Sequence, residues 1–193
     1  MVHATPFTVR KATVAEIPAL NALIEHSARE LSRGFYTAPQ IEAAVLYVFG
    51  VDSNLVVDGT YFVVDAAEQI AGCGGWSRRR TLYGGDQRPV GSAEWLDPRV
   101  DAARIRAFFV APEFARRGIG RRLVDVCAAE AGAAGFSRLE LMATLPGVPL
   151  YTACGFVRVR DVVDVLPDGT AIEFVLMERA IGSRTTERGS HVD

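Results

Sequence analysis

The sequence predicts an α/β fold built on a central sheet of about seven strands. Short apolar runs with the spacing of strands alternate with longer segments whose apolar residues recur at the helical period. At the most informative junction, an apolar run at 105–110 is followed by a turn and then, from about residue 118, by a helical pattern. A strand that leads through a turn into a helix is a basic unit of α/β proteins.

Composition limits the classes of function. The chain has 193 residues, 49% of them hydrophobic and 23% charged, which suits one soluble globular domain. Its formal net charge of −2 disfavours a general nucleic-acid binder, so we expect no nucleic-acid partner. No apolar run is long enough to cross a bilayer, and the first residues lack the apolar core of a signal peptide. We therefore expect a cytoplasmic protein without a membrane partner.

The chain has three cysteines, Cys73, Cys127 and Cys154, and three histidines. The cysteines lack the spacing of metal ligands, and each stands in an apolar setting. We expect buried free thiols and no metal site.

The N-terminal third predicts one strand and two helices. Phe7–Lys11 alternates weakly and is expected to be an edge strand. Thr13 and Glu16 have the spacing of a capping box, so a helix should follow and run to about Gly34. A second helix is predicted at 38–48, and the turn-rich stretch 50–59 is expected to be a connector.

The middle of the chain predicts a hairpin followed by a long loop. Strands are expected at 61–65 and 70–79, joined by a short turn. Three glycines in the second strand, at positions 72, 74 and 75, indicate a bulge or the close approach of another group. The stretch 82–99 contains several Gly and Pro residues and is expected to be a loop, and long loops in compact domains are often functional.

The C-terminal half continues the alternation of strands and helices. The Pro167-Asp168-Gly169 sequence predicts a turn between the last two strands. A single domain at 1–181 and a disordered polar tail at 182–193 are expected. The predicted elements are a strand at 105–110, a helix at 117–132, a strand at 139–144, a short helix at 150–154, and strands at 156–165 and 172–178.

Gly118 and Gly120 lie where the strand at 105–110 leads into its helix. Unpaired backbone N–H groups collect at a helix N-terminus, and the helix dipole favours an anion there. Four arginines surround the same point, which predicts a pyrophosphate site; a tight turn with a solvated basic rim is the simpler alternative. No Lys-Ser/Thr follows the glycines, and Leu123 stands where a dinucleotide fingerprint needs glycine, so neither of those phosphate motifs is present. The arginines are Arg116, Arg117, Arg121 and Arg122.

Three groups of residues now stand in one order: V-x-P at 110–112, R-R-G-I-G at 116–120 and L-Y-x-x-x-G-F at 150–156. This combination resembles the GNAT superfamily of acyl-CoA-dependent N-acyltransferases. The resemblance implies a mixed, strongly twisted sheet with helices on both faces. It also implies that acetyl-CoA lies in a cleft where two central parallel strands splay apart.

The resemblance also implies site residues. Phe109 and Val110 would pair with the pantetheine arm, and Tyr151 would lie near the departing sulfur and give a proton to the leaving thiolate. Thr144 would stand on the pantetheine side, where many members have Asn. The residues expected around the pyrophosphate are Arg116, Arg117, Gly118, Ile119, Gly120 and Arg121.

Two further departures from the family pattern bear on the chemistry. Ala115 stands where the family has Gln or Arg, which removes one side-chain donor that Arg116 can replace. Many members carry a glutamate base on the central strand, whereas this strand has Arg104 and Arg106 and no carboxylate. A base would have to come from elsewhere or act through water. The candidates are the loop carboxylates Glu94, Asp97 and Asp101, which can equally be solvated charges.

The sequence thus predicts an N-acetyltransferase that moves an acetyl group from acetyl-CoA to a primary amine of a small molecule or peptide, by direct attack in a ternary complex. A non-catalytic acyl-CoA-binding or regulatory module is the alternative. The acceptor remains open, and the variable segments 34–38 and 82–99 are expected to form its side of the site. Sheet edges near the C-terminus could pair in a homodimer.

Overall fold

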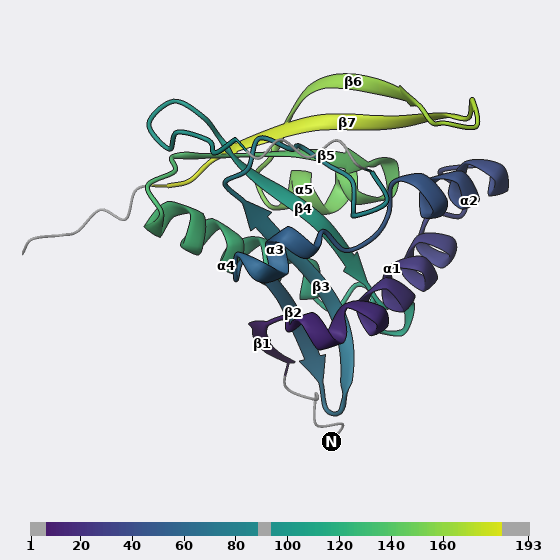
Figure 1. Cartoon of the computed structure of the whole chain (residues 1–193), viewed down its shortest axis with the longest axis horizontal. Helices are drawn as coiled ribbons and strands as arrows, with labels where there is room; N and C mark the ends of the chain where they lie inside the picture. The colour runs from purple at the N-terminus through teal and green to yellow at the C-terminus, as the bar shows by residue number, and fades with distance from the viewer. Residues whose placement is uncertain (1–6, 89–93, 183–193) are drawn as a thin grey trace, which may run out of the picture.

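The computed structural model describes residues 7–88 and 94–182. In this part of the chain, seven strands form one sheet in the order β1-β2-β3-β4-β5-β7-β6 (Figure 1). The strands are β1 (Phe7–Lys11), β2 (Tyr61–Ala66), β3 (Gln69–Ser77), β4 (Ala103–Val110), β5 (Arg138–Thr144), β6 (Val157–Val165) and β7 (Ala171–Ala180).

The sheet is mixed, as predicted. Its strand pairs are antiparallel except β4 and β5, which run parallel at its centre. The β4–β5 ladder contains only two residue pairs, Ala103 with Leu139 and Arg104 with Glu140. From Ile105 onward β4 pairs with β3 alone, so the two central strands separate toward their C-terminal ends.

Helices cover both faces of the sheet. On one face, α1 (Ile17–Leu31), α2 (Ala38–Tyr47) and α3 (Ser53–Val57) pack into a core that includes Leu20, Ile24 and Leu55. On the other, α4 (Ile119–Ala133) and α5 (Val148–Ala153) enclose a second core around Leu123 and Cys127. The chain thus forms the predicted helix–sheet–helix layers.

Local sequence signals explain most helix starts. Thr13 and Glu16 form the predicted capping box, which begins the short 3-10 turn Val14–Glu16 that leads directly into α1. A second capping box, Thr37 with Gln40, begins α2. The expectation of a plain connector at 50–59 was wrong, because α3 forms there with the Asp52 side chain accepting a hydrogen bond from the Asn54 N–H. A helix of one turn is too short to show a 3.6-residue period.

The glycines of β3 allow the close approach that their position predicted. The β3–β4 register shifts between Cys73 and Gly75, and Ala107 on β4 has φ of 53°. A Cβ atom at Gly74 would lie 2.2 Å from the Phe108 ring, so only glycine leaves room for this bulge. The Tyr61 hydroxyl donates a 2.9 Å hydrogen bond to the Ala107 carbonyl and fixes the bulged backbone.

The other elements lie within a few residues of their predicted bounds, and Leu166 N–H donates to Thr170 O across the predicted β6–β7 turn. All three cysteines are buried free thiols. Within the described ranges, no helix is long and apolar enough to cross a membrane, and no group of side chains has the makings of a metal site. Most of the expected tail, and residues 89–93 of the long loop, lie outside the described residues.

Candidate active site

A cleft of about 490 Å³ opens where β4 and β5 separate. One side is formed by the end of β4 and the start of α4, and the other by the segment from the end of β5 through α5. Residues of α1 complete it, including Ser27 and Ala28. Such a cleft beyond the carboxyl ends of parallel strands is a common ligand site in α/β proteins.

The N-terminus of α4 gives this cleft a cradle of backbone donors. Gly118, with φ of 86°, and Arg116, with φ of 64°, are both left-handed, and this curls the chain ahead of the helix. The first intrahelical bond runs from Arg122 N–H to Gly118 O, so the N–H groups of Ile119 and Gly120 precede the helical ladder. Concave backbone of this kind at a helix N-terminus binds anions.

Gly120 is required for packing as well as access. A Cβ atom there would lie 2.6 Å from a methyl group of Leu150, so glycine lets α4 pack closely on α5. The Arg121 guanidinium donates a 2.9 Å hydrogen bond to Ala153 O at the end of α5. These contacts join the cradle to the helix that carries Tyr151.

The structure brings together most residues that the sequence singled out for the acyl-CoA site. Arg117 is the exception: its guanidinium lies 5.5 Å from the centre of the Phe114 ring and does not line the cleft. The residues that do line it are Phe109, Val110, Arg116, Gly118, Ile119, Gly120, Arg121 and Thr144.

A second, smaller cavity of about 70 Å³ adjoins the first across β4. The two share four lining residues, Phe49, Phe108, Phe109 and Thr144. Its walls come from segments far apart in the sequence. The lining residues are Val48, Phe49, Gly50, Tyr83, Gly84, Ile105, Arg106, Ala107, Phe108, Phe109, Met142, Thr144, Tyr151 and Phe174.

Tyr151 lines this smaller cavity from α5 and is 8% exposed. Its ring lies 6.3 Å from that of Phe108 and 5.6 Å from that of Phe156, centre to centre. Burial raises the pKa of the Tyr151 hydroxyl, because the charged phenolate is poorly solvated there. The side chain therefore stays protonated at neutral pH.

None of the three loop carboxylates lines either cavity. Asp97 binds the Arg99 side chain, which lowers the pKa of that carboxyl to about 2. Asp101 accepts a hydrogen bond from the Asp97 N–H, and Glu94 pairs with Arg80. Their contacts are with neighbouring residues of the loop and with Arg80, which fits charges that structure the loop better than a general base.

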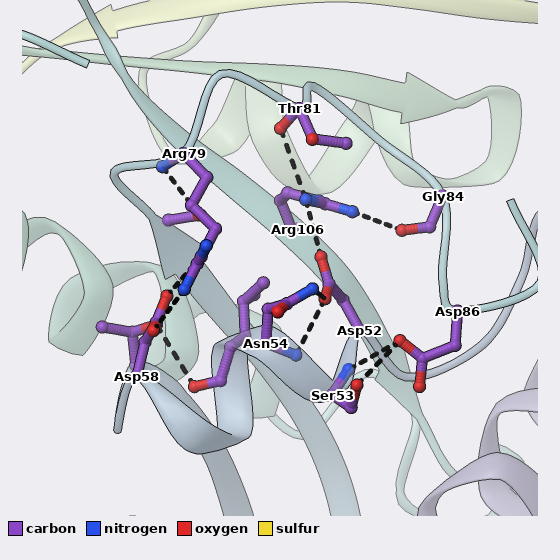
Figure 2. A network of polar contacts seen from close by, with 12 residues as sticks. Asp52, Ser53, Asn54, Asp58, Arg79, Thr81, Gly84, Asp86 and Arg106 are labelled. Atoms are coloured by element: carbon purple, nitrogen blue, oxygen red, sulfur yellow. Dashed lines mark hydrogen bonds and ion pairs between the residues drawn. The ribbon is translucent and has the colours of Figure 1, made fainter. Parts of the chain in front are cut away.

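Sequence reasoning missed a buried ion pair beside the smaller cavity. Arg106, which is 4% exposed, places a guanidinium nitrogen 2.8 Å from a carboxylate oxygen of Asp52 (Figure 2). The same guanidinium donates to the carbonyls of Thr81 and Gly84. Burial lowers the pKa of Arg106 and the Asp52 charge opposes that shift. The sequence signal was an arginine between the apolar residues Ile105 and Ala107 of the strand, which needs a buried partner.

Other aromatic and basic residues have structural settings. Trp76 is buried against Phe136, with ring centres 6.0 Å apart, so it belongs to the core. The Tyr36 hydroxyl donates to Glu173 O and accepts from the Leu145 N–H. His26 is largely exposed, 3.9 Å from Glu113.

A splayed mixed sheet whose central strand leads into a helix N-terminus with free backbone donors is the arrangement expected of an acyl-CoA-dependent acyltransferase. The chain belongs to the Acetyltransferase (GNAT) family, whose family model matches residues 21–156. This membership confirms the expected enzyme class, an N-acetyltransferase that uses acetyl-CoA.

Solved structures share the fold at low sequence identity. A GCN5-related N-acetyltransferase from Rhodopseudomonas palustris has 18% identity and a TM-score of 0.68, over 93% of this chain and 98% of that one. The PaiA N-acetyltransferase from Thermoplasma acidophilum, solved with coenzyme A, has 14% identity and a TM-score of 0.61, over 91% and 99%. YncA from Salmonella typhimurium, a putative acetyltransferase solved with acetyl-CoA, has 14% identity and a TM-score of 0.60, over 95% and 99%. The search of curated proteins found no match.

Proposed function

We propose that this protein transfers an acetyl group from acetyl-CoA to a primary amine of a small molecule or peptide, by direct attack in a ternary complex. The observation that carries the proposal is the pair of adjoining cavities on the splayed strand β4. The large one has the backbone donors that a pyrophosphate needs, and the small one contains Tyr151. Two sites that meet at Phe108 and Phe109 suit a reaction in which both substrates are bound together.

The residues of the large cleft fit acetyl-CoA. The N–H groups of Gly118, Ile119 and Gly120 would hold the pyrophosphate, with Arg116 and Arg121 supplying positive charge. Arg117 stays in the proposal as a backbone donor, since its side chain rests on Phe114. Phe109, Val110 and Thr144 would bind the pantetheine arm along the open edge of β4.

Acetyl-CoA supplies the thioester that the amine attacks. The Ala111 N–H donates to Ala71 O on β3, and neighbouring N–H groups of an extended strand point to opposite edges. The Val110 N–H would therefore point to the open edge of β4 and stabilise the negative charge that develops on the carbonyl oxygen. Tyr151 would hold the proton that the departing thiolate needs.

The amine must lose its own proton before it attacks. For an alkylammonium with a pKa of about 10.4, neutralisation at pH 7 costs about 4.6 kcal/mol. The aromatic side chains that line much of the small cavity support part of this step, because desolvation disfavours the charged amine. A water molecule at the cavity would carry the proton to solvent.

The test is thiol release from acetyl-CoA with a panel of amines: phenethylamine, putrescine, glucosamine, a peptide with a free N-terminus and a peptide with one free lysine. Turnover with at least one amine, accompanied by the mass of an acetylated product, supports the proposal. Calorimetry with coenzyme A runs in parallel. Tight coenzyme A binding with no turnover across the panel would favour the non-catalytic binding module instead.

A further inference from the structure

The segment at residues 81–88 forms one wall of the small cavity through Tyr83 and Gly84. Backbone hydrogen bonds fix its position behind that wall: Gly85 N–H donates to Val48 O and Asp86 N–H to Val51 O, both at 2.9 Å. We call residues 81–88 the acceptor strap. It crosses between the end of α2 and the sheet without forming a helix or strand of its own.

Two side-chain contacts anchor the outer part of the acceptor strap. The Tyr83 hydroxyl donates a 3.0 Å hydrogen bond to Asp164 on β6, and the Arg88 guanidinium pairs with the same carboxylate. Arg88 also lies 4.6 Å from the centre of the Tyr83 ring. These contacts are partly exposed, so each stabilises the strap only modestly.

The inner part of the strap is held from the central strand. Arg106 donates to Thr81 O at 3.3 Å and to Gly84 O, so one guanidinium holds two carbonyls of the strap that stand three residues apart (Figure 2). Ala107 and Phe108, the next residues on β4, line the same cavity. The planar guanidinium holds several acceptors in a fixed arrangement, which a lysine ammonium cannot reproduce.

Asp52 makes this inner contact possible. It begins α3, and its carboxylate neutralises the guanidinium, whose side chain is only 2% exposed. A buried charge without such a partner would be strongly unfavourable. The ion pair therefore connects three segments, β4, the start of α3 and the strap.

We propose that Arg106 is the positioning residue for the acceptor: it holds the acceptor strap against the small cavity and thereby sets acceptor affinity. This rests on the proposed function, in which the small cavity takes the amine. Arg106 acts through the strap backbone and needs no contact with the reacting atoms. Arg106 does not line the large cleft, so its substitution should leave coenzyme A affinity unchanged.

The test compares matched pairs of substitutions. Removing Arg106 alone would strand the Asp52 charge, so the main variant is the double substitution Asp52→Asn with Arg106→Met, in which asparagine keeps the helix cap. Asp58→Asn with Arg79→Met is the control. That pair also joins α3 to the chain after β3, at 2.7 Å, and does not line the small cavity. Arg106→Lys keeps the charge and loses the planar fork.

Hydrogen exchange of the Gly85 and Asp86 amides is the first readout, since it needs no acceptor. We expect exchange to be at least about tenfold faster in the main variant and within about twofold of wild type in the control, with Arg106→Lys in between. Unchanged strap exchange in the folded main variant would overturn the proposal. This result stands whether or not any amine is acetylated, so it is independent of the proposed function.

The second readout is kinetic, with the panel amine that has the lowest KM. We expect the acceptor KM to rise at least about tenfold in the main variant while kcat at saturation and coenzyme A affinity stay within about threefold. A merely structural role would lower the melting temperature and leave both KM values unchanged. A fall in coenzyme A affinity with an unchanged acceptor KM would also overturn the proposal.

Discussion

The two cavities are built in different ways. The large cleft draws many of its lining residues from one continuous stretch, the end of β4 and the start of α4. The small cavity draws on the end of α2, the acceptor strap, three strands and α5, and side chains far apart in sequence hold it in place. In this chain the large cleft rests on local backbone geometry, whereas the small cavity depends on contacts between segments far apart in the sequence.

The largest expected effect is on the chemistry where the cavities meet. In Tyr151→Phe the ring keeps its packing on Phe108 and Phe156, and only the hydroxyl is lost. If that hydroxyl protonates the departing thiolate, turnover should fall by about a hundredfold to ten-thousandfold, or about 2.7 to 5.4 kcal/mol, with coenzyme A affinity spared. Single-turnover rates and a coenzyme A titration measure the two quantities.

A donor whose thiol is a better leaving group provides the control, because the deficit of Tyr151→Phe should shrink with it. A structural tyrosine would instead lower the melting temperature. A chemical rate within about threefold of wild type would leave Tyr151 without the acid role.

The next effect is on stability, where the single and double variants of the Arg106–Asp52 ion pair should differ. Arg106→Met alone strands Asp52, which is 6% exposed, so the free energy of unfolding should fall by about 3–5 kcal/mol. Adding Asp52→Asn should recover most of this loss, since no buried charge is left without a partner. Urea denaturation of the three proteins checks the order, and a double variant as unstable as the single one would contradict it.

Gly74→Ala should disturb both cavities at once. The new Cβ would meet the Phe108 ring, which lines both cavities, so we expect a loss of about 1–3 kcal/mol in stability together with weaker coenzyme A binding and a higher acceptor KM. Gly132→Ala in α4 is the comparison, because its Cβ would meet only the flexible Ile181 side chain at 3.3 Å. A change in coenzyme A binding alone, or in the acceptor KM alone, would show that Phe108 does not couple the two cavities.

The smallest effect concerns the outer anchor of the strap. Hydrogen bonds from Arg88, and then from Tyr83, hold the pKa of Asp164 below its ordinary value. The contact therefore stabilises the fold above about pH 4 and is lost as the pH falls through the folded-state pKa. Asp164→Asn should cost no more than about 1 kcal/mol at pH 7, and urea denaturation should show this difference vanish at low pH. A difference that grew on acidification would have the wrong sign.

The same contrast explains what the sequence could predict. Strand order around the hairpins, the capping box at Thr13 and the cradle at Gly118–Gly120 follow from patterns within a few residues, and the structure has them close to the expected positions. The short helix α3 was missed because one turn shows no period. The Arg106–Asp52 pair was missed because nothing near either residue in the sequence identifies the other as its partner. For the same reason the sequence could not show whether Glu94, Asp97 and Asp101 act as a general base or only as charges that structure the loop.

The account depends most on the claim that backbone at the α4 N-terminus binds the cofactor independently of the acceptor strap. Titration calorimetry with coenzyme A tests it on wild type, Gly118→Asp, Gly169→Asp and the Asp52→Asn/Arg106→Met double variant. Gly118 and Gly169 have φ of 86° and 85° and open space around a Cβ, so aspartate should strain both alike. We expect Gly118→Asp to weaken binding at least about tenfold by placing a negative charge beside the pyrophosphate, with the other two variants within about twofold of wild type. Unchanged affinity in folded Gly118→Asp would contradict the account.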